Sequence, residues 1–191
     1  MRTEGRIRQI EGHKLTISSI LLQATEPQII TASHDSTIRM FDWTAGKTRY
    51  ILKNHEYPVR ALLFHPSLNT FVSGSIDNIK QWKSNSGEFI QDLSGHTREA
   101  IINGLATNKD GVLVSAEDDG IMHLWDWNTG RLFQRIKTRF IPHGDGIWSK
   151  PDVCSVTFDI SGKRLIATKA DGTIQMYRKK IVNLIRNEMY S

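Results

Sequence analysis

The feature that most constrains this fold is a pattern that returns at a nearly constant interval. The segments "EGH", "KNH" and "SGH" place histidines at His13, His55 and His96, so the intervals between them are 42 and 41 residues. A fixed period of this size is typical of repeat architectures, in which each repeat is one supersecondary unit. We therefore expect a series of equivalent units along the chain.

A second recurring segment follows each histidine and also appears in a fourth copy. The copies are "IITASHDSTIRMFDW" (29–43), "FVSGSIDNIKQWK" (71–83), "LVSAEDDGIMHLWDW" (113–127) and "LIATKADGTIQMYRK" (165–179). Each has a turn aspartate, namely Asp35, Asp77, Asp119 or Asp171, and then an aromatic residue, namely Phe41, Trp82, Trp125 or Tyr177. The aspartate precedes the aromatic residue by six positions in three copies and by five in the second.

Within each copy the local sequence favours β-strands. Short runs are rich in Ile, Val, Leu, Thr, Phe and Trp, and turn sequences such as "HPSLN", "NKDG" and "DISGK" separate them. The segments "TRYIL", "EFIQDL" and "RLFQRI" read as a fourth strand after the first three. Only the last dozen residues carry any sign of a helical period, so the predicted fold class is all-β.

A period of 40 to 45 residues with a Gly-His near its start and a Trp-Asp near its end resembles the WD40 repeat. The resemblance implies β-propeller blades, which are four-stranded sheets whose apolar faces are covered by neighbouring sheets around an axis. We expect a propeller segment over residues 1–178 and a C-terminal tail over 179–191. The expected blades are approximately 11–52, 53–93, 94–137 and 150–178, with 5–10 as a strand of a preceding or closing blade.

The same resemblance gives the recurring polar residues a structural role. In each repeat it implies a hydrogen-bonded chain of the His, the Ser or Thr of the second strand, the turn Asp and the Trp of the third strand. Such a chain matters because a buried polar group without a partner costs about 1–3 kcal/mol. The predicted chains are His96, Ser115, Asp119 and Trp125 in the third copy, His55, Ser73, Asp77 and Trp82 in the second, and His13, Thr31 and Asp35 in the first.

The Ser/His/Asp triples also raise the question of catalysis or metal binding. The sequence has no GxSxG elbow, and each of these serines falls in a predicted buried strand, so a catalytic triad is disfavoured. The seven histidines are dispersed, and the single cysteine, Cys154, has no CxxC partner, which argues against a metal site. No phosphate-binding glycine loop is present. We therefore predict no enzymatic activity, no cofactor and no small-molecule substrate.

Three further positions carry specific expectations. His123 stands where other copies have Arg39, Lys80 or Gln175, so a half-exposed sheet residue is expected. Cys154 is expected to be a buried, apolar-like thiol. Phe140 and Trp148, in the connection over 138–151, would be interface anchors or would pack back onto the sheet.

Composition narrows the cellular setting. One cysteine fits a reducing compartment, which is the cytosol or the nucleus. No run approaches the roughly 20 apolar residues that span a bilayer, and the N-terminus has no signal-peptide core, so no membrane association is predicted. A formal net charge of +5 makes RNA contact possible, although the basic residues are spread along the chain and the contact would be secondary.

A closer resemblance is carried by "EPQIITASHDSTIRMFDWTAGKTR", "SGSIDNIKQWK", "FIQDLSGH" and "GVLVSAEDDGIMHLWDWNTG". Together they are similar to the pleiotropic regulator family of spliceosomal WD40 proteins. The resemblance implies a non-catalytic scaffold in pre-mRNA splicing, located in the nucleus, whose partners are spliceosomal proteins of the nineteen complex. In that family's propeller of about seven blades, this chain would correspond to the last four.

Four blades of a probable seven-bladed propeller predict an open arc. Side chains suited to wedges of about 51° would have to pack at about 90° to close a ring of four. An arc leaves two sheet faces uncovered, so the isolated chain is expected to self-associate or aggregate. A monodisperse monomer in light scattering at tens of micromolar, about the range in which exposed apolar surface associates, would contradict this expectation.

Alternative functions stay open at this stage. They are a truncated or non-functional remnant, a WD40 adaptor in another nuclear complex, a ubiquitin-ligase receptor and a direct RNA-binding module. The receptor role would need a docking domain such as an F-box, which is not visible. In WD40 proteins the residues three and five positions after the histidine tend to surface on the narrow face. The possible partner-binding face is therefore Thr16, Ser18, Pro58, Arg60 and Glu99.

Overall fold

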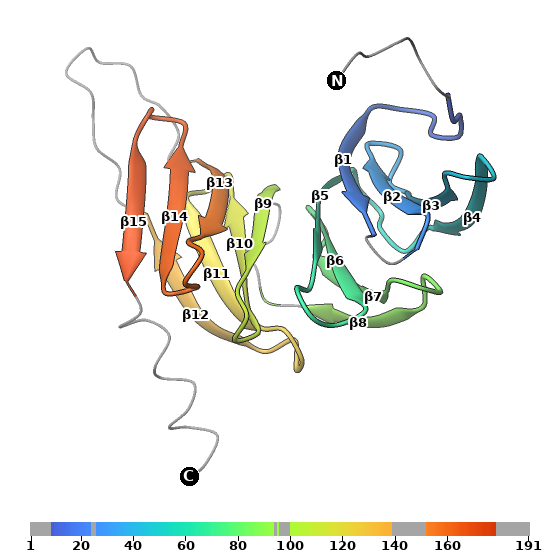
Figure 1. Cartoon of the computed structure of the whole chain (residues 1–191). Helices are drawn as coiled ribbons and strands as arrows, with labels where there is room; N and C mark the ends of the chain where they lie inside the picture. Colours follow the sequence, from blue (N-terminus) through green and yellow to red (C-terminus); the bar gives the residue numbers. More distant parts are fainter. Residues whose placement is uncertain (1–8, 24–25, 94, 96–99, 139–151, 179–191) are drawn as a thin grey trace, which may run out of the picture.

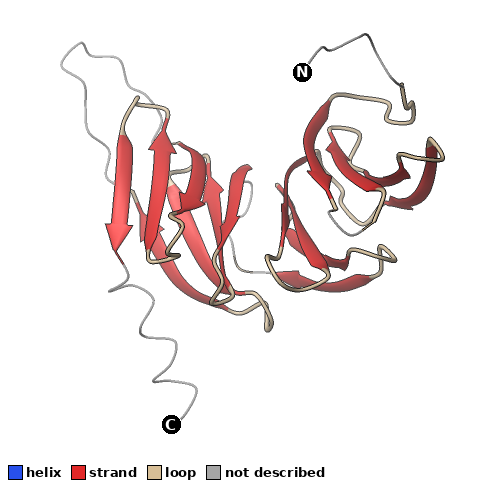
Figure 2. Cartoon of the chain, viewed as in Figure 1, coloured by secondary structure: helices blue, strands red, loops and turns tan. Residues whose placement is uncertain are grey.

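The computed structural model describes residues 9–23, 26–93, 95, 100–138 and 152–178, and every regular element in these residues is a β-strand (Figure 2). The first sheet contains β1 (Ile17–Leu22), β2 (Gln28–Ser33), β3 (Ile38–Asp42) and β4 (Lys47–Leu52). The second contains β5 (Val59–Phe64), β6 (Thr70–Ser75), β7 (Ile79–Lys83) and β8 (Phe89–Leu93). The third contains β9 (Ile102–Thr107), β10 (Val112–Glu117), β11 (Ile121–Asp126) and β12 (Leu132–Lys137). The fourth contains β13 (Val153–Phe158), β14 (Arg164–Lys169) and β15 (Ile174–Arg178).

All four sheets are antiparallel meanders with the same register. Thr31 pairs with Ile20 on one side and with Arg39 on the other, as Ser73 pairs with Leu62 and Lys80 in the second sheet. The strands "TRYIL", "EFIQDL" and "RLFQRI" form the outer strands β4, β8 and β12, as predicted. The all-β, repeating fold expected from the sequence is thus confirmed.

The sheets follow one another as blades in an open arc (Figure 1). The first strands of successive sheets, β1, β5, β9 and β13, contact one another in turn along the inside of the arc. The first and fourth sheets lie at the two ends of the arc, well apart, so the ring is not closed. The open arc agrees with the expectation from the sequence.

Three apolar clusters fill the spaces between successive sheets. Ile30 and Met40 of the first sheet pack with Leu62 and Trp82 of the second. Equivalent clusters join the second sheet to the third and the third to the fourth. We call the side of a sheet that faces the next sheet its forward face, and the opposite side its backward face. Because the middle sheets are covered on both faces, β6 and β10 are buried along almost their whole length.

Two glycines allow neighbouring sheets to approach closely. A Cβ built on Gly74 would lie 2.8 Å from Cγ2 of Ile102, and a Cβ built on Gly104 would lie 3.3 Å from the backbone Cα of Ser155. The side chain of Ile102 can adjust its rotamer, whereas a backbone atom cannot give way without moving the strand. Gly104 therefore fixes how near β13 stands to β9.

Cys154 is exposed, so the expectation of a buried thiol was wrong. The residue occupies a register shift between Val153 and Ser155. Equivalent shifts place Ser18 and Arg60 between their neighbours in β1 and β5. The hydroxyl of Ser18 donates a hydrogen bond to the Val59 carbonyl of the next sheet. A bulge residue therefore points toward the next sheet. Within the described residues no sheet follows the fourth one, so Cys154 is exposed.

Several expectations fall outside the described residues. They concern residues 5–8 of the strand expected over 5–10, His96, Glu99, most of the connection that contains Phe140 and Trp148, and the tail over 179–191.

Candidate functional site

The second sheet brings all four of its predicted polar residues together. His55 Nδ1 lies 2.8 Å from Asp77 Oδ1, and His55 Nε2 lies 2.7 Å from Ser73 Oγ. The Trp82 indole N–H donates to the same Ser73 hydroxyl at 2.8 Å. Trp82 is 1% exposed and Ser73 is 0% exposed, so the chain of contacts runs from the sheet interior to the Asp77 turn.

The carboxylate of Asp77 is committed to this chain. Burial acts to raise its pKa, but the hydrogen bond and charge of His55 and the backbone N–H groups of Asn78 and Glu56 outweigh burial and lower the pKa to about 2. A carboxylate that strongly favours its charged form, with its oxygens facing internal donors, is a brace for the turn.

This lowered pKa predicts a specific loss of stability in acid. The folded pKa of about 2 is below the usual aspartate value of 3.8. The stabilisation is therefore present above the unfolded pKa and is lost as pH falls through both values. Between pH 7 and pH 3 we expect the wild type to lose about 1 kcal/mol more free energy of unfolding than Asp77→Asn. Urea titrations at both pH values measure the difference. Glu88→Gln, at an exposed surface position, is the control and should follow the wild type. Equal losses in the wild type and Asp77→Asn would contradict the prediction.

The first sheet has the same chain without its aromatic donor. His13 Nδ1 lies 3.0 Å from Asp35 Oδ2, and His13 Nε2 lies 2.7 Å from Thr31 Oγ1. Burial opposes ionisation of Asp35, but hydrogen bonds from Thr37, Lys14 and His13 hold its pKa well below its usual range. Phe41 occupies the place of the tryptophan, and its ring packs edge-on to the His13 ring at 6.2 Å.

In the third sheet the described part of the chain shows two of the four predicted residues in contact. The Trp125 indole N–H donates to Ser115 Oγ at 3.1 Å, and both residues are fully buried. Asp119 accepts the Ile121 N–H at 2.9 Å within its own turn. His96, the fourth predicted member, lies outside the described residues, so its contact with Asp119 stays a prediction.

The fourth sheet replaces the histidine with a lysine. Lys169 Nζ lies 2.7 Å from Asp171 Oδ2, and the side chains are 0% and 1% exposed. Burial acts to raise the pKa of Asp171, but the hydrogen bonds from Lys169 and Thr173 lower it to about 2. The negative charge of the turn aspartate is therefore balanced by a lysine of the same hairpin. The repeat pattern does not predict this pair, although the lysine two residues before Asp171 is a signal in the sequence.

His123 is fully buried, so the expectation of a half-exposed residue was wrong. It lies on the backward face beside Trp125 and is paired across the sheet with Ser115, where the preceding sheet covers it. His123 Nδ1 is 2.7 Å from Glu117 Oε1, and both side chains are 0% exposed. The two atoms are within ion-pair distance, but their alignment is not that of a hydrogen bond.

A second tryptophan connects two sheets in a way that the sequence analysis missed. The Trp127 indole N–H donates to Thr70 Oγ1 of the preceding sheet at 3.1 Å, and the His65 ring packs edge-on to Trp127 at 4.8 Å. Burial lowers the pKa of His65. The signal in the sequence was the second tryptophan of "WDW". Only the first of the two tryptophans belongs to the predicted hydrogen-bonded chain of the repeat.

The predicted partner-binding face lies at the ends of the sheets where the first strands begin. Thr16, Pro58 and Arg60 are exposed there. Ser18 is also exposed, but its hydroxyl bridges to the neighbouring sheet and is not free for a partner. Glu99 lies outside the described residues.

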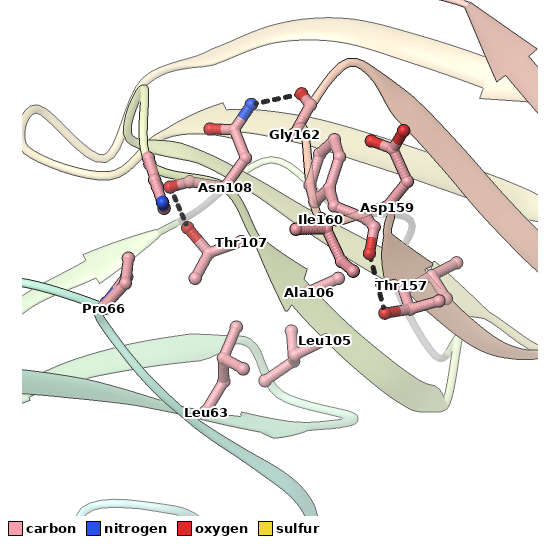
Figure 3. A pocket seen from close by; sticks show the side chains of 13 residues that line it. Leu63, Pro66, Leu105, Ala106, Thr107, Asn108, Thr157, Asp159, Ile160 and Gly162 are labelled. Atoms are coloured by element: carbon pink, nitrogen blue, oxygen red, sulfur yellow. Dashed lines mark hydrogen bonds between the residues drawn. The ribbon is translucent and has the colours of Figure 1, made fainter.

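A pocket of about 290 Å³ opens at the opposite ends of the first strands. Leu63 and Pro66 of the second sheet, Leu105 of the third and Ile160 of the fourth face it (Figure 3). The Asn108 side-chain amide donates to the Gly162 carbonyl at 3.2 Å and ties two turns at its rim. The two ends of the sheets thus present different surfaces, one of loop residues and one with an apolar hollow.

The described residues contain no group of three or more His, Cys, Asp or Glu side chains that could hold a metal ion. They also form no helix long and apolar enough to span a membrane.

Repeated antiparallel meanders, packed face to face and braced in the first two sheets by contacts of a histidine with a hydroxyl residue and a turn aspartate, define a β-propeller repeat protein. The model of the WD domain, G-beta repeat, matches residues 5–42, 46–79, 87–126 and 135–178, and the chain belongs to this WD40 family.

Its relatives narrow the family further, and they confirm the resemblance to pleiotropic regulators. Pleiotropic regulator 1 of Mus musculus is 53% identical over 120 residues, which are 63% of this chain and 23% of that protein. Protein pleiotropic regulator PRL2 of Arabidopsis thaliana is 40% identical over 70% of this chain and 27% of its own length. Pre-mRNA-splicing factor PRP46 of Candida glabrata is 31% identical over 71% and 31%. The chain thus matches less than a third of the length of these relatives.

Two solved structures share the fold. The computationally designed Ika4 protein superposes with a TM-score of 0.73 at 25% identity, covering 92% of this chain and 99% of that chain. The computationally designed Ika8 protein superposes with a TM-score of 0.71 at 25% identity, covering 88% of this chain and 48% of that chain.

Proposed function

We propose that this chain is a non-catalytic protein-interaction scaffold in pre-mRNA splicing. The observation that carries the proposal is the internal use of its polar groups. In the chain of the second sheet, which has all four members described, His55 is bound to Ser73 and to Asp77 inside a sheet, so the groups that could do chemistry are occupied. What the protein offers to other molecules is therefore the shape and charge of its surface. Relatives that are named pre-mRNA-splicing factors support the process, and that process implies the nucleus.

We place the partners among the spliceosomal proteins of the nineteen complex and the docking surface at the loop end of the sheets. Among the five residues predicted for this surface, Arg60 is the charged residue that the structure describes. It stands at the bulge at the start of β5, where the register shift turns its side chain out of the sheet. Thr16 and Pro58 flank it on neighbouring loops.

Affinity capture from nuclear extract tests the proposal. The tagged chain should recover splicing proteins, identified by mass spectrometry, and Arg60→Glu should reduce the recovery about tenfold, as reversing a charge at an interface does. Lys109→Glu is the matched control, since Lys109 is an exposed cation at the pocket end of the sheets.

Three outcomes would count against this assignment. Equal loss in the two variants would contradict the choice of face. Recovery that disappears after nuclease treatment would favour direct RNA binding. A wild-type chain that recovers no splicing protein would favour a non-functional remnant.

A further inference from the structure

The forward face of the fourth sheet is exposed at positions that are interior in the other sheets. Ile174 and Met176 of β15 are 70% and 71% exposed. Their register partners are Thr168 and Ile166, which makes them equivalent to Ile38 and Met40 in the first sheet. Those two residues are 0% exposed because the second sheet covers them. The fourth sheet therefore carries an interface surface of the same kind.

Along β1 the backward face of the first sheet is exposed in the complementary way, whereas Thr31 and Phe41 of the same face are 4% and 5% exposed. Ile20, paired with Thr31, is 60% exposed. The equivalent residues Leu62 and Val156 are 7% and 6% exposed, since each is covered by the sheet before it. Leu22, on the same face, is 68% exposed. One chain thus carries the two halves of an interface that it uses three times internally.

We propose that two copies of this chain associate head to tail into a closed ring of eight blades. The forward face of each fourth sheet packs on the backward face of the partner copy's first sheet. This packing covers both apolar faces at once. Two identical head-to-tail contacts close the assembly.

A second copy fits better than any other occupant because each copy supplies both complementary faces. The arc also has a suitable curvature, since it superposes on 48% of the chain of Ika8. A second arc of the same size would correspond to the remaining half of the Ika8 chain. Eight blades require about 45° per blade, close to the about 51° of a seven-bladed ring.

The mass of the purified 191-residue chain is the first test. Light scattering coupled to size exclusion should give twice 21.8 kDa, unchanged on dilution through the micromolar range. Met176→Glu should raise the dimer dissociation constant about tenfold or more, because it places an unpaired charge in an apolar interface. Ile160→Glu, at a fully exposed turn residue away from this face, should leave the dimer intact. A wild-type monomer, or species that grow in mass with concentration, would overturn the proposal.

The orientation is tested by mixing two variants. Ile20→Lys and Met176→Glu should each weaken self-association, and an equimolar mixture should restore the dimer. A mixed ring has one Lys–Glu contact and one wild-type contact. The equivalent residues Val156 and Leu124 share one cluster between the third and fourth sheets. Failure of the mixture to recover, with circular dichroism showing both variants folded, would contradict the head-to-tail arrangement.

The native cysteine provides a third readout. Two of the bulge residues contact the start of the next sheet's first strand. Ser18 donates to the Val59 carbonyl, and Asn103 donates to the Val153 carbonyl at 3.1 Å. The next member of this series pairs Cys154 with Ile17 of the partner copy. Ile17→Cys should therefore form a disulfide-linked dimer under an oxidised glutathione buffer, and Ile160→Cys should not. Equal cross-linking of both variants would contradict the proposed contact.

Discussion

Replacing Trp82 with alanine will lower the free energy of unfolding by about 3–5 kcal/mol, the range found for deleting a large buried aromatic side chain. The indole is 1% exposed, stacks against Phe71 with ring centroids 6.3 Å apart, and lies in the cluster between the first two sheets. Alanine leaves a cavity there and also removes the N–H that donates to Ser73. Urea unfolding followed by circular dichroism measures the loss.

The comparison variant is Trp82→Phe, which keeps most of the ring and removes only the donor. We expect it to cost about 1–2 kcal/mol, because Ser73 still has the His55 imidazole as a partner. The first sheet already has this arrangement, with Phe41 beside the His13–Thr31 pair. If Trp82→Phe proved as damaging as Trp82→Ala, the hydrogen bond rather than the packing would dominate.

Replacing Lys169 with methionine will destabilise the chain by about 3–5 kcal/mol, because it removes the ammonium group that pairs with the buried carboxylate of Asp171. The two side chains are 0% and 1% exposed, and Nζ lies 2.7 Å from Oδ2. Methionine conserves the volume of the lysine stem, so the loss reflects charge rather than packing. The same urea measurement applies.

The double variant Lys169→Met/Asp171→Asn separates the two causes. It should recover most of the lost stability, since the neutral amide no longer has an uncompensated charge and can still accept from the Thr173 N–H, which donates to Asp171 at 3.0 Å. A double variant no more stable than Lys169→Met would show that the lysine acts through its stem.

The repeat spacing was sufficient to predict the type and order of the strands in the described residues. The histidine intervals and the recurring aspartate fixed the blade register, because each strand and turn in a four-stranded meander needs a set number of residues. The contacts His55–Ser73–Asp77 and Trp82–Ser73 lie where the spacing placed their members. The Lys169–Asp171 pair was missed because lysine does not belong to the repeat pattern, and only the fold shows that its ammonium is buried.

Burial at individual positions was the part that the sequence did not determine. Cysteine and isoleucine are residue types common in protein interiors, yet Cys154 and Ile174 are exposed. His123, by contrast, is polar and completely buried. Whether a strand residue is covered depends on which sheet stands in front of it or behind it, and that is decided by how the sheets stack. Periodicity along the chain reports which face a side chain shares with its neighbours. Only the tertiary structure shows which of those faces are covered, because the covering atoms come from other sheets.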